Sequence, residues 1–462
     1  MNNKNYIPHR IFWTWDHSTN WSLHAYGAQN CGVANEYAKA PEMFEKDYKR
    51  VIDFCAEHKF DAVGIVALIR EKHGGVESAR RLCAYAQEKG VKVYIISGIF
   101  AYGGVYYDGD HKYNLDRFLR ENPECMGKTE EGEPFFARYK GRHGYKIQAQ
   151  GCPSSKKLHE FALESLDWLF KEIPELGGIQ MEAGDNGVCY CPECMKRRGK
   201  GDGFLSISDM VGIYPQATDV VLKRSPDAMV ICETYSHFLD KACTVLESDN
   251  PSPDLQKLYD MPESIFWQWK CDEALRHGRW KIGVRMLPHM QKFKHVMRAH
   301  SGTQWWGGRA TFAVEKIRQQ CLLSFESGID CVSMFGENAP FHTNAEFNYL
   351  AMEYFADHPH ATTENFIKDV MAPLLGGEEK AAFFYESASC HEQIEKIPGI
   401  STKAAKIAAE VSDYETMRRW QYLASYLNGY YWEAMMNGGK PELMANSDRV
   451  GDLEEADSDK NN

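Results

Sequence analysis

Short apolar runs alternate along the chain with longer stretches in which apolar residues recur every three or four positions. The first three runs cover residues 10–15, 62–69 and 91–98, and each ends at polar or small residues. Between the first two runs, Phe44, Tyr48 and Ile52 mark the apolar face of a helix expected over 42–59. Alternating strand-like and helix-like segments are typical of βα units around a parallel sheet.

The same alternation continues to about residue 335. It predicts further strands at 178–181, 228–232, 264–269, 303–306 and 330–335, and helices at 75–89, 156–171, 206–224, 287–299 and 313–327. Eight strands with helices between most of them favour an α/β fold, the closed (β/α)8 or TIM barrel. A doubly wound open sheet is the alternative. The connection over 99–155 is unusually long for a βα unit, and such connections are often functional.

The chain changes character after the eighth predicted strand. We expect residues 1–343 to form a catalytic barrel and residues 344–445 to form a helical region packed on it, because helical periodicity continues there without a convincing strand. Residues 446–462 are polar and acidic, so we expect a disordered tail.

Polar residues collect directly after the predicted strands. Barrel enzymes build their active sites at the carboxyl ends of the strands, so these residues are expected on one rim. They are Asp16, Arg70, Glu182, Glu233 and Glu337.

Carboxylates at this rim indicate acid–base chemistry. Glu182 follows the fourth strand, and Asp185 lies three residues later in a Gly-flanked turn. Glycoside hydrolysis generally uses two carboxyl groups, one holding a proton and one ionised. We expect Glu182 to be the general acid and Glu337 or Glu233 to be its partner, with Asp185 as a further candidate. The structural alternative is that these groups form salt bridges or cap a helix.

Aromatic, arginine and histidine side chains in the same segments suit sugar recognition. Indole and phenol rings can stack on the apolar C–H faces of sugars, and Arg can hold a carboxylate. Because strand residues alternate between two faces, half of these side chains would instead be core. The predicted substrate-binding residues are Asp16, His17, Arg70, His73, Tyr102, Tyr106, Tyr235, Trp267, Trp269 and Trp305.

A cysteine cluster follows Glu182. Cys189, Cys191 and Cys194 form C-x-C-x-x-C, which can contribute three thiolates to a structural zinc ion. A closed zinc site needs a fourth ligand, which Cys152 or Cys232 could supply. Free thiols that pack the loop are the alternative.

Composition narrows the function further. The chain has 462 residues and a formal net charge of −12, without a basic stripe, so we expect no nucleic-acid partner. We find no apolar run of ~18 residues, so we expect no membrane partner. The first residues lack an apolar leader, and 14 cysteines are too sparse for a disulfide scaffold, so we expect a cytoplasmic protein.

Three segments of the chain resemble glycoside hydrolases with (β/α)8 catalytic domains. They are the segment 180–185 with its trailing cysteine motif, the segment 151–154, and the helical tail from Asn344. That tail is similar to the segment after the barrel in hexosaminidase-like and α-glucuronidase-like enzymes. The adjacent Asp-Glu pair of family 20 hexosaminidases is absent, because Ala183 follows Glu182.

The resemblance and the rim residues together predict a glycosidase acting on a small saccharide or glycoside and needing no cofactor. A non-catalytic carbohydrate-binding barrel would keep the aromatic residues and Arg70 without a working carboxylate pair. A metal-dependent barrel such as a sugar isomerase would bring histidines and carboxylates together on one ion. The oligomeric state is left open.

Overall fold

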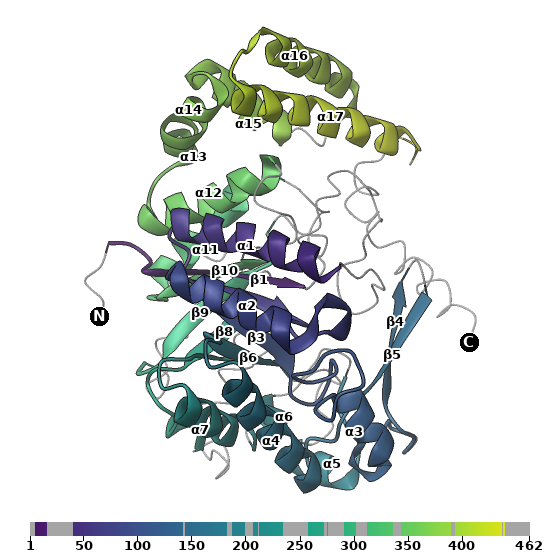
Figure 1. The fold of residues 1–462 in the computed structure, drawn as a ribbon. Coiled ribbons are helices and arrows are strands. Elements are labelled where there is room, and N and C mark those ends of the chain that lie inside the picture. The colour runs from purple at the N-terminus through teal and green to yellow at the C-terminus, as the bar shows by residue number, and fades with distance from the viewer. Residues whose placement is uncertain are drawn as a thin grey trace.

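Eight parallel strands close into a barrel, as predicted (Figure 1). The computed structural model describes residues 5–15, 40–141, 144–182, 187–198, 207–210, 212–233, 257–271, 275, 291–301, 312–335, 343–389, 393–436 and 438. Going round the barrel, the strands are β1 (His9–Trp15), β2 (Ala62–Val66), β3 (Lys92–Gly98), β6 (Gly178–Glu182), β7 (Met229–Glu233), β8 (Phe266–Lys270), β9 (Lys294–Ala299) and β10 (Cys331–Phe335). The closed order confirms the (β/α)8 fold and excludes the open sheet.

Helices cover the outer face of the barrel. Their apolar faces pack on every second residue of the strands, such as Phe12, Val63 and Ile95, which belong to the outer core. The helices of this layer are α1 (Pro41–Glu57), α2 (Gly75–Glu88), α4 (Lys156–Glu172), α7 (Tyr214–Arg224), α11 (Val314–Glu326) and α12 (Thr343–Asp357). Two short helices, α5 (Pro192–Arg198) and α6 (Ile207–Met210), lie in the connection between β6 and α7.

A second, smaller apolar cluster fills the inside of the barrel. Its strand members alternate along the strands with the outer residues, and the largest fully buried one is Tyr94 on β3. The Tyr94 hydroxyl donates to the Phe12 carbonyl, 3.2 Å away. A Cβ at Gly64 on the neighbouring strand would lie 2.1 Å from the Tyr94 ring. Glycine at position 64 therefore makes room for a ring that fills the barrel interior.

The predicted seventh strand is misplaced in the sequence analysis. Residues 294–299 form β9, within the segment predicted as a helix over 287–299, and they pair with β8 and β10. The segment predicted as the seventh strand, 303–306, lies outside the described residues. Lys294, His295 and Arg298 interrupt the apolar run and hide the strand, although every residue of β9 after Lys294 is buried. The helix predicted over 206–224 is two helices, α6 and α7.

The connections after β2 and β3 contain short elements of their own. After β2 comes a 3-10 turn, η1 (Glu71–His73). After β3 come α3 (Leu115–Glu121), η2 (Pro123–Cys125), and the antiparallel pair β4 (Phe136–Gly141) and β5 (Gly144–Ala149). The β4–β5 pair stands to one side of the barrel (Figure 1).

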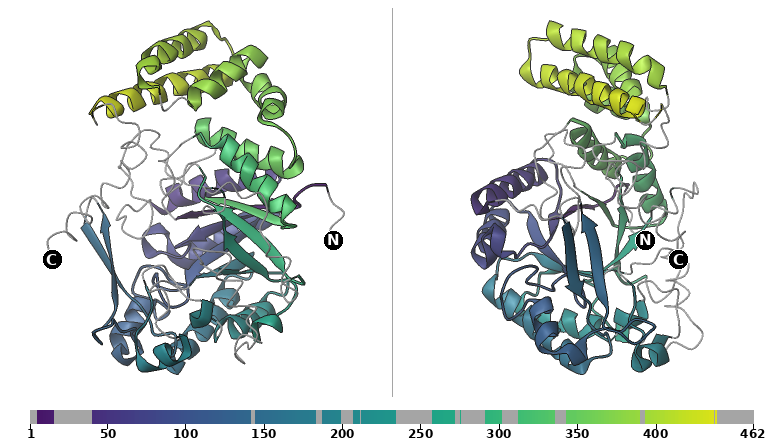
Figure 2. Two further views of the ribbon diagram at one scale, coloured as in Figure 1. Left: turned by 180° about the vertical axis from the view of Figure 1, so that it is seen from behind. Right: turned by 90° about the vertical axis from the view of Figure 1, so that its right-hand side faces the viewer.

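The end of the described chain is helical, and Figure 2 shows these helices gathered over one side of the barrel. They are α13 (Thr363–Phe366), a π-helical turn η5 (Ile367–Met371), α14 (Ala372–Leu375), α15 (Glu378–Ala388), η6 (Ile394–Lys396), α16 (Ile397–Glu410) and α17 (Tyr414–Met436). Helix α12 packs on α11 and β1, so it belongs to the helical layer around the barrel. The predicted division at residue 343 and the tail over 446–462 stay predictions. Of the helices described, none has the length and apolarity needed to cross a bilayer.

Candidate active site

Two glutamates end neighbouring strands of the barrel. Glu182 is the last residue of β6 and Glu233 is the last residue of β7, and the register pairs Met181 with Cys232 just before them. Met181 and Cys232 belong to the outer core, so alternation turns both glutamates toward the barrel interior. Both are buried, with 5% and 2% of their surface exposed. The strand ends and the alternation of side chains therefore bring the carboxylates of Glu182 and Glu233 to the same side of the sheet.

One amide group contacts both carboxylates. The Nε2 atom of Gln180 donates to Glu182 Oε1 over 2.8 Å and to Glu233 Oε2 over 3.4 Å. Because both oxygens contact the same nitrogen atom, the distance between them cannot exceed the sum of these two distances, 6.2 Å. Gln268 on β8 donates from its own Nε2 to Glu233 Oε2. The glutamates are thus held as a pair by two amide side chains that also point into the barrel.

Arg298 on β9 brings a positive charge to the pair. Its Nη1 atom lies 3.8 Å from Glu182 Oε1 and 3.5 Å from Glu233 Oε2. The guanidinium also lies over the Trp13 ring, 4.5 Å from its centroid. Sequence reasoning missed Arg298 because it placed this segment in a helix. A charged residue within a short, otherwise apolar run was the signal that could have identified it.

The environment of Glu182 favours its protonated form. Burial raises its pKa to about 7, and the negative charge of Glu233 acts in the same direction. Arg298 and the Gln180 hydrogen bond oppose the shift but do not cancel it. A carboxyl group with a pKa near 7 can donate a proton at neutral pH and recover it later, as a general acid–base catalyst must.

Arg70 and Tyr102 lie at the same end of the barrel, after β2 and β3. Arg70 is buried, and its Nε atom lies 3.2 Å from Asp108 Oδ2. Its guanidinium lies 5.5 Å from the centroid of the Tyr107 ring. Tyr102 and Tyr107 belong to the interior cluster, and Tyr102 has a left-handed φ of 54°. Such strained backbone in a non-glycine residue is frequent at functional sites.

Four other predicted sugar contacts are packed away from the barrel interior. Trp267 and Trp269 flank Gln268, so they point outward, and both are fully buried in the outer core. The Trp269 Nε1 atom donates to His295 Nδ1 over 2.9 Å. His73 is fully buried with its ring 4.5 Å from that of Phe44, and Tyr106 stacks on His111. We therefore leave these four out of the proposed sugar site.

Six predicted site residues lie outside the described residues. The sequence predictions for them stay predictions: these are Asp16, His17, Asp185, Tyr235, Trp305 and Glu337.

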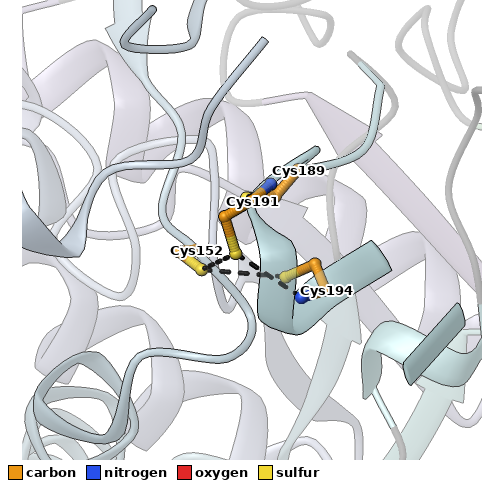
Figure 3. A group of neighbouring side chains, drawn as sticks. All are labelled: Cys152, Cys189, Cys191 and Cys194. Atoms are coloured by element: carbon orange, nitrogen blue, oxygen red, sulfur yellow. Dashed lines mark hydrogen bonds between the residues drawn. The ribbon is translucent and has the colours of Figure 1, made fainter. Parts of the chain in front are cut away.

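The cysteine motif gains a fourth thiol from the connection after β3. Cys152 lies 3.5 Å from Cys191 and 3.7 Å from Cys194, measured between sulfur atoms (Figure 3). The sulfur atoms of these three and of Cys189 all lie within 4.8 Å of one another. Cys232, the other fourth ligand considered, is a buried thiol of the outer core on β7. Of the two fourth ligands considered, the fold thus brings Cys152 to the motif.

Comparison with solved structures shows the same barrel fold. No protein family and no curated protein sequence matches the chain. A GH138 enzyme targeting pectin rhamnogalacturonan II superposes with a TM-score of 0.54 at 10% identity, over 92% of this chain and 57% of the enzyme. A β-N-acetylhexosaminidase gives a TM-score of 0.47 at 13% identity, over 80% of this chain and 76% of that protein. A GH20 exo-β-N-acetylglucosaminidase from Vibrio harveyi gives 0.41 at 11% identity, over 75% and 54%.

This chain spans little more than half the length of the GH138 enzyme. The likeness to this enzyme nevertheless agrees with the (β/α)8 barrel fold that the sequence segments implied. At this identity the likeness is one of fold, so the site itself must carry any argument about chemistry.

Proposed function

We propose that this protein is a glycosidase that cleaves a small saccharide or glycoside, with Glu182 as general acid and Glu233 as its partner. The observation that carries the proposal is a pair of carboxylates no more than 6.2 Å apart, one of which has a pKa raised to about 7. Glycoside hydrolysis generally uses such a pair, one protonated and one ionised.

The spacing favours cleavage with retention of configuration. Retaining enzymes hold the two carboxyl groups about 5–5.5 Å apart, and inverting enzymes separate them by about 6.5–9.5 Å to admit a water molecule. The ceiling of 6.2 Å lies below the inverting range. Glu337, the other partner that the sequence predicts, follows the eighth predicted strand, and a partner across the barrel mouth would favour inversion instead.

In the proposed first step, Glu182 gives its proton to the glycosidic oxygen while the bond from that oxygen to the anomeric carbon breaks. The Glu233 carboxylate forms a new C–O bond to the same carbon. In the second step water attacks the anomeric carbon, its proton passes to Glu182, and the Glu233 carboxylate leaves. No oxidant or cofactor is needed, so a metal bound by the cysteine cluster would be structural.

Arg298 and the two amides position the reacting carboxylates in this proposal. Arg298 contacts both and so limits the electrostatic cost of an ionised Glu233 beside Glu182. Gln180 holds the two carboxylates at a fixed spacing.

Tyr102 and Arg70 remain proposed substrate contacts, since both lie in segments that follow barrel strands. The eleven described cysteines form no disulfide among themselves, which suits the proposed location in the reducing cytoplasm.

A panel of chromogenic glycosides, assayed with wild type and Glu182→Gln, tests the proposal. Gln keeps the size of Glu but cannot donate the proton, so turnover should fall by ~10²-fold or more. Glycosides with very good leaving groups should suffer least, and wild-type turnover should fall as pH rises through 7. Glu346→Gln is the matched control, because Glu346 pairs with Arg419 far along the chain, and it should keep wild-type activity.

The outcomes separate the competing functions. Wild-type turnover by Glu182→Gln would show that another carboxylate, Asp185 among them, is the acid. Binding of glycosides without turnover by wild type would favour the non-catalytic barrel. Isomerisation of free sugars, abolished by a chelator, would favour the metal-dependent alternative. NMR of the first-formed anomer then reports retention or inversion, and inversion would point to Glu337.

A further inference from the structure

We infer that Cys152, Cys189, Cys191 and Cys194 bind one zinc ion that joins two connections of the barrel. Their sulfur atoms lie within 4.8 Å of one another, and three of the four thiols are buried. Closed structural zinc sites use four protein ligands in a tetrahedron, and a set of four cysteine thiolates is common. The site uses neither Glu182 nor Glu233, so it would hold a metal whether or not the protein is a glycosidase.

The spacing of the sulfur atoms fits one metal ion. Zinc–sulfur bonds of about 2.3 Å in a tetrahedron separate the sulfur atoms by about 3.8 Å. Cys152 lies 3.5 Å from Cys191 and 3.7 Å from Cys194, just below that value. A disulfide would need about 2.05 Å. The thiols are therefore spaced as ligands of a common centre, with Cys191 and Cys194 presented at the start of α5 opposite Cys152 (Figure 3).

Backbone amides around the cluster are directed at the sulfur atoms. Cys189 Sγ accepts from the amides of Lys128 and Cys191, over 3.3 and 3.4 Å. Cys191 Sγ accepts from the amide of Cys194 over 3.5 Å. Hydrogen bonds of this kind stabilise thiolates and orient metal ligands. A loop that only packed neutral thiols would have no need to aim three amides at two sulfur atoms.

Positively charged and polar side chains surround the same cluster. Arg197 Nη2 lies 3.5 Å from Cys194 Sγ, and Ser154 Oγ lies 3.1 Å from it. Arg198 donates to the Cys189 carbonyl over 2.6 Å. A zinc ion with four thiolates carries two negative charges. Arg197 and Arg198, which also pair with the carboxylate of Asp209, would offset part of that charge.

The zinc would join two chain segments, one that precedes β6 in the sequence and one that follows it. Cys152 ends the long connection after β3, and Cys189 closes the loop that follows Glu182 on β6. Hydrogen bonds already link these segments, from Gln150 Nε2 to the Gly187 carbonyl over 2.9 Å and from the Tyr190 amide to the Lys128 carbonyl over 2.8 Å. A metal at their junction would add a further link between these two described segments.

Metal analysis of the full-length protein, purified without chelator, is the first test. We expect close to one zinc per chain and a lower melting temperature after treatment with a strong chelator, with recovery when zinc is restored. Cobalt(II) in place of zinc should give the intense thiolate-to-cobalt charge-transfer absorption and the visible bands of a tetrahedral sulfur site. These measurements need no enzymatic activity, so they are independent of the proposed hydrolysis.

Cys152→Ser tests the ligand that comes from outside the motif. It should lose most of the bound zinc, whereas the matched control Cys232→Ser, also a buried thiol, should keep it. Since Cys152→Ser could also fail to fold, Cys191→His supplies a second variant. It should retain zinc and shift the cobalt spectrum toward three sulfur ligands and one nitrogen.

Three results would overturn the inference. One is wild-type protein without bound metal that is also insensitive to chelators. Another is iron in place of zinc at full occupancy. The third is Cys152→Ser with wild-type zinc content, since this would remove Cys152 from the ligand set.

Discussion

Two clusters of paired charges, one inside the barrel and one where α12 meets α17, show how environment divides similar residues between chemistry and structure. In the barrel, Glu182 and Glu233 contact Arg298 over 3.8 and 3.5 Å. At the helical junction, Glu346 receives Arg419 Nη2 at 2.5 Å and Nε at 3.1 Å. Both clusters therefore join glutamate to arginine, and they differ in how closely the charges meet.

The difference lies in geometry and in burial. The Glu346 pairing is short and bidentate, which is the strong arrangement for a guanidinium and a carboxylate. The barrel pair sits at longer distances from its arginine, and Glu182 is fully enclosed together with a second carboxylate. With a pKa of about 7, the carboxyl group of Glu182 is partly protonated at neutral pH, and a proton that can be given away is what acid catalysis needs. The helical cluster holds two helices together, and we assign no chemistry to it.

Replacing each arginine by Met should sharpen this contrast most. Arg298→Met removes a cation from a buried carboxylate pair, and such changes cost about 3–5 kcal/mol of unfolding free energy. The loss should be largest above pH 7, where Glu182 would otherwise ionise. Arg419→Met should cost less, because Arg418 also contacts Glu346, over 3.4 Å.

Chemical denaturation of both variants at pH 5 and pH 8 measures these losses. Equal losses at the two sites, with no dependence on pH for Arg298→Met, would contradict the distinction drawn between the two clusters.

Glu182 should also make the stability of the wild-type protein depend on pH. Its pKa is about 7 in the folded state and about 4.5 when exposed, so the folded state binds the extra proton between these values. Stability should therefore fall as pH rises from about 4.5 through 7, by roughly 3 kcal/mol in all at ~1.36 kcal/mol per pKa unit. Glu182→Gln should remove this slope and gain stability relative to wild type above pH 7.

Melting curves of wild type, Glu182→Gln and the Glu346→Gln control across pH 4.5–8.5 measure the effect. A slope that persists in Glu182→Gln would assign the titration to another group.

The smallest expected effect concerns Tyr214 on α7. Its hydroxyl donates to the Glu233 carbonyl over 2.6 Å and lies 3.1 Å from the Met181 carbonyl, so it links the two strands that carry the glutamates. Tyr214→Phe should cost about 1–2 kcal/mol, as expected for loss of a buried hydrogen bond. If the link helps position the pair, turnover should fall several-fold with little change in KM.

Tyr354→Phe is the control, because Tyr354 bonds to Asp369 in an exposed setting. A turnover in Tyr214→Phe equal to that of Tyr354→Phe would limit Tyr214 to a stabilising role.

The barrel could be predicted from the sequence because most of its strands are short apolar runs between amphipathic helices. The exception is β9, where Lys294, His295 and Arg298 occupy half of the positions. A helix is easily predicted for such a mixed segment, because His295 and Arg298 are buried only once β9 pairs with β8 and β10 in the barrel. Arg298, one of the three residues that obscured β9, is also the residue that contacts the glutamate pair.

The candidate site was predictable where a polar residue ends an apolar strand, as for Glu182 and Glu233. It was less predictable where the role of a residue depends on which face of the sheet its side chain points to. Trp267 and Trp269 lie beside Gln268 in sequence, yet they point to the opposite side of the sheet. The choice of Cys152 over Cys232 as the fourth cysteine likewise depended on how the connection after β3 returns to the barrel.

The fit between Gly64 and Tyr94 links two positions on neighbouring strands. With a Cβ at Gly64 only 2.1 Å from the ring, any larger residue at 64 would require a smaller one at 94. Among homologous sequences the two positions should therefore covary, with glycine opposite tyrosine and a bulkier residue at 64 only where the ring has been replaced. An alignment deep enough to show that covariation would reveal the register of β2 against β3 without any coordinates.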